Sequence, residues 1–236
     1  MKEYLQEGIQ KLGISLSEKQ IENLLTYVTL LLEYNQHTNL TAIREEKAVI
    51  EKHILDSLLL QEYIPKDATT AIDIGTGAGF PGIPLKIAFP GLKVTLLDSL
   101  NKRVGFLNEV IEALGLTDIT AVHGRAEDYG RDAKYREQYD ICVSRAVANM
   151  STLSEYCIPF VKKGGYFIPY KSGKADEEIA QARSAVKKLG GEMKDIIVKV
   201  LPETDVERTF VPVKKMAITA KKYPRKAGLP SKEPLG

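Results

Sequence analysis

Apolar residues in the first part of the chain, residues 1–65, recur every three or four positions, which predicts helices. The second predicted helix spans 18–34 and begins after Ser17 and Gln20, whose S-x-x-Q spacing is typical of a capping box. A third helix is predicted over 47–63, just before a proline. Because each helix has a broad apolar face, we expect these helices to form a cap that packs on the rest of the chain.

From residue 68 the pattern changes to short apolar runs that alternate with helical stretches. The predicted strands span 70–74, 93–97, 119–122, 140–144, 166–170, 192–201 and 210–219. The predicted helices span 83–89, 102–114, 152–161 and 175–189. Strands separated by helices pair in parallel with right-handed crossovers, whereas the last two strands have no helix between them and predict an antiparallel hairpin.

The pattern as a whole predicts an α/β fold with a doubly wound, seven-stranded, mostly parallel sheet and an N-terminal helical cap. We expect a cap over 1–65, a sheet domain over 66–220 and a basic C-terminal tail over 221–236. Seven strands that end in a hairpin are typical of the Rossmann-like fold of class I methyltransferases.

Three closely spaced glycines, Gly75, Gly77 and Gly79, follow the first predicted strand in the run IDIGTGAGFPGIPL. Glycines let the backbone turn sharply and approach a ligand without a Cβ in the way. Asp98 ends the next predicted strand, at the spacing where a carboxylate meets the ribose hydroxyls of a nucleotide. These features predict a site for a nucleotide-like cofactor.

The same run contains a G-x-G-x-x-G pattern, which is typical of dinucleotide binding. In dinucleotide-binding proteins the first glycine of this pattern closes the strand. Here the pattern starts at Gly77, whereas the strand is closed by Gly75. Counted from Gly75, the position of the third glycine is occupied by Phe80. Phe80 and Pro81 widen the turn, which favours a ligand without phosphates. Asp73, inside the strand, either holds the loop or faces a cationic ligand. S-adenosylmethionine is cationic and has no phosphate, so it is the predicted cofactor, and a nicotinamide oxidoreductase ranks last among the alternatives.

Residues that follow the later strands should lie at the same edge of the sheet. Ala126 and Glu127 follow the third strand and either receive the adenine edge and its amine or form an ordinary turn. Arg145 follows the fourth strand, where the run continues to Ala146, and needs an anionic partner: a methionine carboxylate, an RNA phosphate or a structural carboxylate. Lys171 follows the fifth strand. We expect Arg145 and Lys171 to serve the reaction by positioning cofactor or RNA backbone.

Composition narrows the function further. Lys and Arg total 33 against 31 for Asp and Glu, so the net charge of +2 gives no global argument for nucleic acid. Two cysteines and three scattered histidines predict no metal site and no disulfide framework. The polar, helical N-terminus and the lack of long apolar runs predict no signal peptide and no membrane span, which leaves the cytoplasm as the default.

Two classes of base methylation are disfavoured by the residues present. Enzymes that methylate exocyclic amines commonly carry a proline-rich, aromatic loop after the fourth strand, where this chain has SRAVA. Methylation at carbon five of a pyrimidine needs a cysteine nucleophile on a loop, whereas Cys142 lies inside an apolar strand.

Seven motifs resemble those of the RsmG (GidB) family of 16S ribosomal RNA guanine-N7 methyltransferases. They are NLT at 39–41, H-x-x-D-S at 53–57, DIGTGAGFPGIPL from 73, LLDSLNKRVGFL from 96, GRAE from 124, SRAVA from 144 and YPRKAGLPSKEPL near the C-terminus. The resemblance implies transfer of a methyl group from S-adenosylmethionine to N7 of one guanine, position 527 in standard rRNA numbering, in the small subunit. It also implies that the cofactor is bound by Gly75, Phe80, Ala126, Glu127 and Arg145, with Asp98 on the ribose.

Guanine N7 has an in-plane lone pair and no proton, so its attack on a sulfonium methyl needs no general base. Catalysis can then come from holding the nucleophile, methyl carbon and sulfur in line. A bidentate arginine on N7 and O6, the usual reading of guanine, would block the nucleophile. We therefore expect basic side chains to contact phosphates or cofactor.

RNA contacts are expected from basic residues around the cleft and in the tail. The candidates are Lys102, Arg103, Arg125, Lys171, Lys174, Lys221, Lys222, Arg225, Lys226 and Lys232. Tyr223 is a candidate for stacking on a base. His53 and Asp56 lie one helical turn apart and either face the cleft or tie the cap to the domain. Two further alternatives stay open: a non-enzymatic ribosome-assembly factor that binds RNA, and a methyltransferase for another acceptor.

Overall fold

The computed structural model describes residues 1–145, 148–172 and 176–236. Two predicted site residues, Ala146 and Lys174, lie outside these ranges.

The cap begins with α1 (Lys2–Lys11) and α2 (Glu18–Thr38). The predicted capping box at the start of α2 is confirmed: Gln20 N donates to Ser17 Oγ at 3.3 Å, and Ser17 N donates to Gln20 Oε1 at 2.8 Å. The Gln20 amide also donates to Ile87 O at 2.7 Å, which ties the cap to a helix on the sheet.

The third predicted helix is shorter than expected and is interrupted. It consists of α3 (Glu46–Val49), a π-helical turn (Ile50–Leu55) and α4 (Asp56–Leu58), and a separate 3₁₀ turn follows (Gln61–Tyr63). π-Helical turns are rare and are found frequently at functional sites. Here the turn contains His53 and leads into Asp56.

A single mixed sheet forms the centre of the molecule. Its strands are β1 (Thr70–Ile74), β2 (Lys93–Asp98), β3 (Ile119–His123), β4 (Tyr139–Arg145), β5 (Val161–Ser172), β6 (Gly191–Met193), β7 (Ile197–Val200), β8 (Glu207–Phe210) and β9 (Val213–Lys215). The order β3-β2-β1-β4-β5-β8-β7 is parallel through β5 and antiparallel beyond it, and β9 pairs with both β5 and β6. The doubly wound topology is therefore confirmed.

The predicted strand 192–201 is divided into β6 and β7, and in place of the predicted strand 210–219 the chain forms β9 and the earlier β8, so the described residues form nine strands instead of seven. Pro212 lies between β8 and β9 and has no N–H to donate to a neighbouring strand. Its carbonyl accepts from Lys194 N at 2.8 Å, in the gap between β6 and β7, so both breaks lie at the same place.

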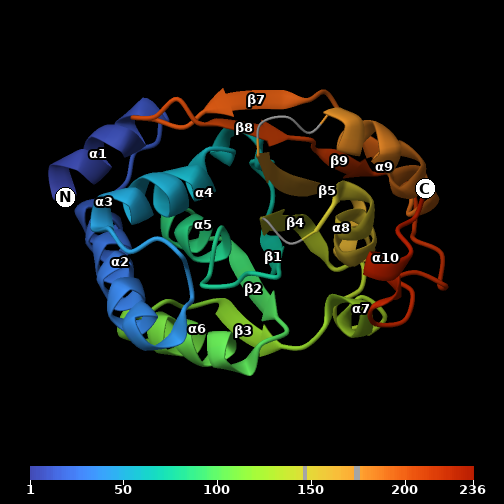
Figure 1. The fold of residues 1–236 in the computed structure, drawn as a ribbon, viewed down its shortest axis with the longest axis horizontal. Coiled ribbons are helices and arrows are strands. Elements are labelled where there is room, and N and C mark those ends of the chain that lie inside the picture. Colours follow the sequence, from blue (N-terminus) through green and yellow to red (C-terminus); the bar gives the residue numbers. More distant parts are fainter. Residues whose placement is uncertain (146–147, 173–175) are drawn as a thin grey trace.

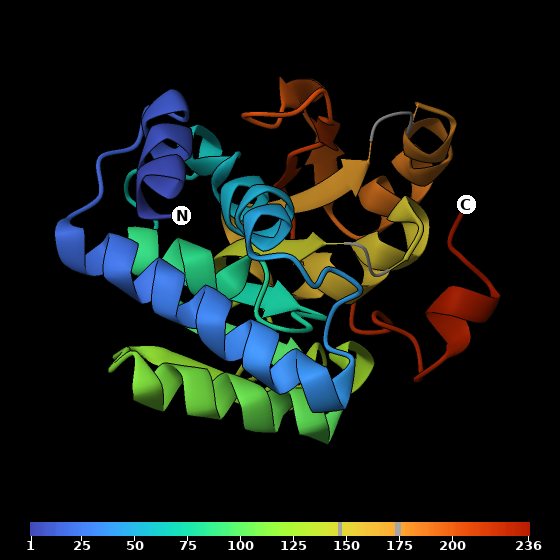
Figure 2. The same ribbon diagram turned by 60° about the vertical axis from the view of Figure 1, so that its left-hand side comes forward.

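Helices cover both faces of the sheet (Figure 1). The first face carries α5 (Gly82–Ala88) and α6 (Asn101–Ala113) together with α2, and Figure 2 shows α2 lying alongside α6. The second face carries α8 (Met150–Cys157) and α9 (Asp176–Lys188), with the short α7 (Ala126–Tyr129) and α10 (Leu229–Lys232) nearby. Leu24 and Leu31 of the cap belong to the same buried cluster as Ile83 and Leu96, so the cap and the sheet share one hydrophobic core.

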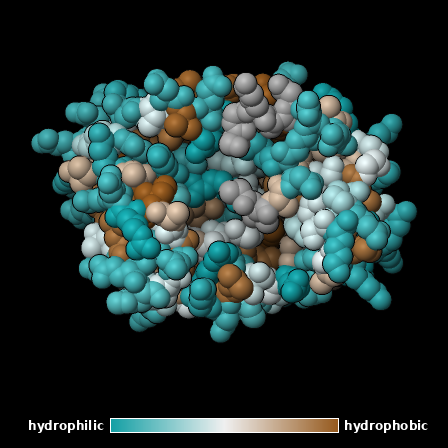
Figure 3. Space-filling model, viewed as in Figure 1, coloured by the Kyte–Doolittle hydropathy of each residue, from teal (hydrophilic) through white to brown (hydrophobic). Residues whose placement is uncertain are grey.

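The C-terminal tail folds back on the body beside α7 and α8 (Figure 1). Tyr223, Pro224 and Pro230 are buried in this position, and Arg131 Nε donates to Pro224 O at 2.7 Å. The proposed stacking of Tyr223 on a base is therefore wrong for this conformation, because its ring is only 8% exposed. The face of the molecule drawn in Figure 3 is mostly hydrophilic, with apolar residues in small separate groups.

Candidate functional site

The carboxyl ends of β1, β2, β3 and β4 meet at one edge of the sheet, where the strand order reverses between β1 and β4. Ligands of doubly wound sheets bind at such a switch point. Two hollows of about 360 and 260 Å³ lie at this edge and share Gly75, Asp98 and Ser99 in their walls. They are therefore neighbouring parts of one cleft.

The first hollow is lined by residues from the cap as well as from the sheet. Thr41 and His53 of the cap line it together with Gly77, Phe80 and Arg145. The second hollow is bounded by Gly124, Arg125, Ala126, Glu127, Tyr156 and Ser231, among others. Except for Gly79, every predicted cofactor residue lines at least one of the two hollows.

Asp98 fixes the glycine loop. One carboxylate oxygen accepts from Gly77 N at 2.9 Å and lies 3.3 Å from Arg103 Nη1, and the other accepts from Leu100 N at 2.9 Å. A carboxylate has about four lone-pair sites, so three hydrogen bonds leave it room for one further donor. The geometry gives Asp98 a structural role and leaves an acceptor site for the predicted contact with a ribose hydroxyl.

Gly79 serves the packing of the cap. A Cβ at this position would lie 2.5 Å from Ile83 Cδ1 and 2.8 Å from Tyr27 Oη, and the backbone has φ +103°. The hydroxyl of Tyr27 donates to Ala78 O, and its ring packs 5.1 Å from that of Phe80. Gly79 therefore faces Tyr27 of the cap and does not line the cleft.

Asp73 holds the loop, which decides between the two roles that the sequence left open. Its Oδ2 accepts from Thr76 Oγ1 at 2.7 Å and from Gly82 N at 2.9 Å. The residue is fully buried, and burial raises its pKa from 3.8 to about 6. A buried carboxylate at the first residue of α5 leaves no place for a phosphate there, because the helix N-terminus is already used by an anion. The dinucleotide interpretation is disfavoured on this ground.

Arg145 joins the sheet to the cap. Its guanidinium donates to Asp56 Oδ2 at 2.8 Å, to Lys52 O at 3.0 Å and to His53 Nδ1 at 3.0 Å. Asp56 is 1% exposed and also accepts from Arg208 Nε at 2.7 Å. Two guanidiniums around one carboxylate leave a net positive charge beside the first hollow. Arg145 also retains two of its five N–H donors, so an anionic group in the hollow can bind it.

His53 is held in its neutral form. Burial, followed by the charge of Arg145, lowers its pKa from 6.5 to about 3. Its Nδ1 lies 3.0 Å from both Arg145 Nη2 and Lys52 O, and its Nε2 lies 2.8 Å from Thr41 Oγ1. The imidazole stacks on Phe80 with 4.5 Å between ring centroids. His53 thus ties the cap to the domain and also forms a wall of the cleft.

Lys171 contacts other parts of the protein. Its ammonium donates to Ala148 O at 2.9 Å and pairs with Glu178 at 2.6 Å, and it lines neither hollow. Glu178 also accepts from Met150 N, so this group holds the start of α8. The arrangement gives Lys171 a structural role, and its predicted part in the reaction stays a prediction.

The predicted RNA contacts differ in their exposure. Arg125 is exposed at the rim of the second hollow, and Lys221, Lys222 and Lys226 are exposed on the tail. Arg225 is not free, because its guanidinium makes a bidentate pair with the fully buried Glu155, with 2.7 Å between Nη2 and Oε2.

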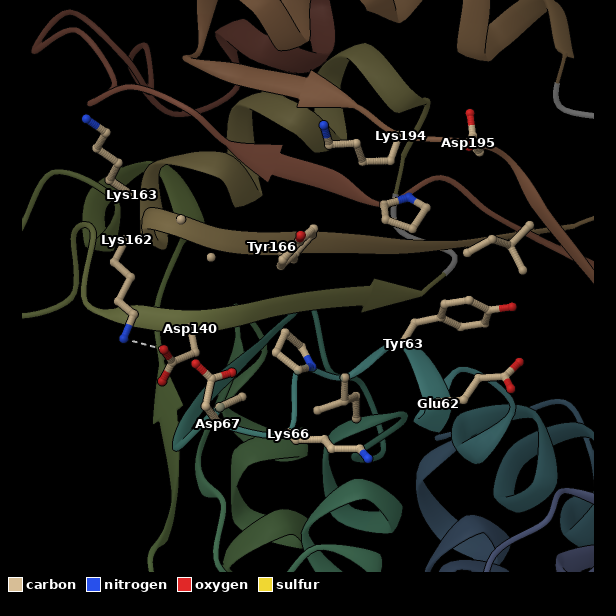
Figure 4. A pocket seen from close by; sticks show the side chains of 17 residues that line it. Glu62, Tyr63, Lys66, Asp67, Asp140, Lys162, Lys163, Tyr166, Lys194 and Asp195 are labelled. Atoms are coloured by element: carbon tan, nitrogen blue, oxygen red, sulfur yellow. Dashed lines mark ion pairs between the residues drawn. The ribbon is translucent and has the colours of Figure 1, made fainter.

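A larger hollow, of about 890 Å³, lies at the opposite, amino-terminal edge of the sheet and contains none of the predicted site residues (Figure 4). Asp140 there pairs with Lys162 and accepts two backbone and two hydroxyl hydrogen bonds from Thr69 and Thr70. This carboxylate therefore holds the start of β1 to β4.

Within the described ranges, no cluster of three or more His, Cys, Asp and Glu side chains is arranged to hold a metal ion. The helices in these ranges include none with the length and apolar character needed to cross a membrane.

Three important residues of the site escape prediction from the sequence. Arg208 is 152 positions from its partner Asp56, Gly228 of the tail donates to Glu127 in the wall of the second hollow, and Ser231 lines that hollow. Of these residues, only those in the tail belong to a recognisable sequence motif, YPRKAGLPSKEPL. Its basic residues predict an RNA-binding segment and give no indication that the tail contributes to the cleft.

Comparisons with known proteins identify the family of this chain. Residues 20–209 match the GidB family, described as rRNA small subunit methyltransferase G. Relatives named ribosomal RNA small subunit methyltransferase G include one from Lachnoclostridium phytofermentans, 54% identical over 97% of this chain and 95% of the relative. Another, from Alkaliphilus metalliredigens, is 52% identical over 98% of this chain and 97% of the relative.

Solved structures share the fold at low sequence identity. TrmN from Thermus thermophilus matches with a TM-score of 0.52 and 14% identity over 71% of this chain and 53% of that chain. M. jannaschii TYW2 in complex with AdoMet matches with a TM-score of 0.50 and 14% identity over 68% of this chain and 77% of that chain. The class I methyltransferase fold is thus confirmed, and the sequence relatives decide the family: the chain belongs to the GidB family, rRNA small subunit methyltransferase G.

Proposed function

We propose that this protein transfers a methyl group from S-adenosylmethionine to N7 of one guanine in the 16S RNA of the small ribosomal subunit, in the cytoplasm. The observation that carries the proposal is the divided cleft at the switch point of the sheet, in a chain of this family. A ribosome-assembly factor without catalytic activity would not need the cleft residues. A methyltransferase for an acceptor other than RNA would not account for the membership of this chain in an rRNA methyltransferase family.

The residues present fit S-adenosylmethionine. The capped start of α5 suits a ligand without phosphate, as described for Asp73. Arg145 has free donors and a positive surrounding for the methionine carboxylate, and Asp98 has one acceptor site left for a ribose hydroxyl. Ala126 and Glu127 would receive the adenine or ribose in the second hollow. The cofactor supplies an electrophilic methyl group on a sulfonium.

Among the described residues that line the first hollow, no side chain is suited to act as a general base. The His53 imidazole is a weak base, because burial and the charge of Arg145 lower its pKa to about 3. The Asp98 carboxylate already accepts three hydrogen bonds and keeps one acceptor site for the ribose. A nucleophile that brings its own lone pair and has no proton to lose suits such a site. The protein then contributes position and the exclusion of water, both of which lower the barrier.

Single-turnover transfer of labelled methyl to small-subunit RNA, followed from pH 7 to 9, tests this proposal. These values lie above the pKa of Asp73, about 6, so the charge of this carboxylate does not change over the range. We expect the rate to be independent of pH over this range, because N7 loses no proton. A rate that rises tenfold per pH unit would contradict the proposal and favour a nucleophile such as guanine N1, whose proton must leave.

A further inference from the structure

The C-terminal strap, defined here as residues 226–236, starts from a fixed point. Immediately before it, Arg225 binds the buried Glu155 of α8 with its guanidinium, and Arg225 N donates to Glu155 Oε1 at 2.7 Å. Arg136 Nη1 also donates to Tyr223 O at 2.8 Å. The chain therefore enters the strap in a defined place and direction, beside the second hollow.

The strap then contributes directly to that hollow. Gly228 N donates to Glu127 Oε1 at 2.9 Å, and Ser231 lines the hollow together with Ala126. Thr152 Oγ1 donates to the carbonyl of Pro230 at 2.9 Å, in a buried position. The second hollow is thus incomplete without the strap, although the sequence separates Gly228 from Glu127 by 101 positions.

The contact with Gly228 determines how Glu127 is presented. Glu127 is 5% exposed and lies on α7, a helix of four residues that cannot hold a side chain rigidly by itself. Within the described part of the chain, the Glu127 carboxylate accepts a hydrogen bond from Gly228 N at Oε1. Its Oε2 can therefore accept a hydrogen bond from a ligand. A carboxylate oriented before binding loses less conformational freedom on binding, so the affinity is higher.

We infer that the strap is a wall of the cofactor pocket and that Gly228 is a positioning residue for Glu127, which accepts a hydrogen bond from the adenosyl part of the ligand. The inference rests on the proposed function for the identity of that ligand. The motif at the C-terminus then serves cofactor binding in addition to any contact of its lysines with RNA. Gly228 has φ +82°, so the direction of its N–H depends on a backbone conformation that favours glycine.

Calorimetric titration of the full chain and of a chain ending at Arg225 tests the inference. The shortened chain keeps the pair with Glu155 and lacks Gly228 and Ser231. With S-adenosylmethionine, S-adenosylhomocysteine and adenosine as probes, we expect at least a tenfold loss of affinity for all three, because the missing wall faces the part that they share. Gly228→Ala in the full chain should lose about threefold, and Lys232→Ala, which removes an exposed side chain of the strap, should bind as the wild type does.

Wild-type affinity for all three probes in a folded shortened chain would overturn the inference. If the shortened chain does not fold, as judged by circular dichroism and its melting temperature, the folded Gly228→Ala variant decides, and unchanged affinity there overturns it. A full chain that binds none of the probes would instead refute the proposed function. As a second readout, S-adenosylmethionine should slow tryptic cleavage after the exposed Lys226, and an unchanged cleavage rate at saturating cofactor would count against the strap as a wall.

Discussion

Arg145, at the end of β4, and Asp56, on α4 of the cap, form an ion pair with 2.8 Å between Nη1 and Oδ2, although they lie 89 positions apart. The pair lies beside the first hollow and brings the cap into the wall of the cleft. Buried ion pairs contribute little net stability, but they fix geometry, because any other arrangement leaves a buried charge unpaired. The cap is therefore part of the site, and its position controls the cleft.

Arg145→Lys should lower the transfer rate at least tenfold. Lysine retains a positive charge for Asp56 but cannot donate at the same time to Asp56, Lys52 O, His53 and an anionic ligand group. The sequence alone predicts that the fold is unaffected by loss of this arginine, but the structure changes this expectation. Because Arg145 joins Asp56 and His53 of the cap to the sheet, we also expect a lower melting temperature. Unchanged single-turnover kinetics would contradict the assignment.

Arg208→Gln is the matched control for Arg145. It disturbs the same carboxylate at the oxygen that Arg145 does not bind, and Arg208 lines neither hollow. We expect reduced stability with an affinity for S-adenosylmethionine close to that of the wild type. Equal losses of affinity in the two variants would mean that Arg145 acts only through the position of the cap.

The pH dependence of stability should reveal His53. Its pKa is lowered from 6.5 to about 3 on folding, so the unfolded chain binds the proton first as the pH falls. Its contribution to stability is complete above pH 6.5 and is lost as the pH falls from there toward 3. Between pH 7.5 and 5.5 the loss is about 1 kcal/mol. Urea unfolding should show a correspondingly smaller decrease for His53→Gln, and parallel curves for the two proteins would refute this role.

Two glycine substitutions should separate packing from binding. Gly79→Ala places a Cβ against Ile83 and Tyr27 at φ +103°, so we expect a loss of stability of about 2 kcal/mol or more. At Gly77 nothing lies within 4 Å of a new Cβ and φ is +62°, so Gly77→Ala should cost about 1 kcal/mol and mainly weaken cofactor binding. Denaturant unfolding and calorimetric titration of both variants measure the two effects, and a reversed pattern would contradict the assignment of the loop.

The basic residues of the tail should divide into two groups. Arg225→Ala leaves the buried Glu155 without its cation and should cost about 3 kcal/mol of stability. Replacing the exposed Lys221, Lys222 and Lys226 by alanine should leave stability unchanged and reduce the slope of log K for RNA against log salt by about one for each phosphate that is no longer bound. An identical salt slope would exclude these lysines from the RNA interface.

Much of this fold could be predicted from local patterns. The capping box of α2, the parallel strands up to β5 and the glycine loop follow from the spacing of a few residues. The break between β8 and β9 has a local signal in Pro212, but its alignment with the break between β6 and β7 could not be predicted, because it involves a contact of Pro212 with Lys194.

The cofactor residues after each strand could be predicted because doubly wound sheets bring their carboxyl ends together. The partners of those residues could not, since Arg208 and Gly228 reach the site only through tertiary contacts. For the same reason Arg225 and Tyr223, in a basic segment, are predicted from the sequence to be free but are engaged in the folded chain.

The most direct test of the central claim is transfer of label from S-adenosylmethionine to small-subunit RNA that lacks the modification, followed by nucleoside mass spectrometry and mapping. The account predicts label in N7-methylguanosine at a single site. Label in another nucleoside, or bound cofactor with no label in RNA or in the intact subunit, would contradict it.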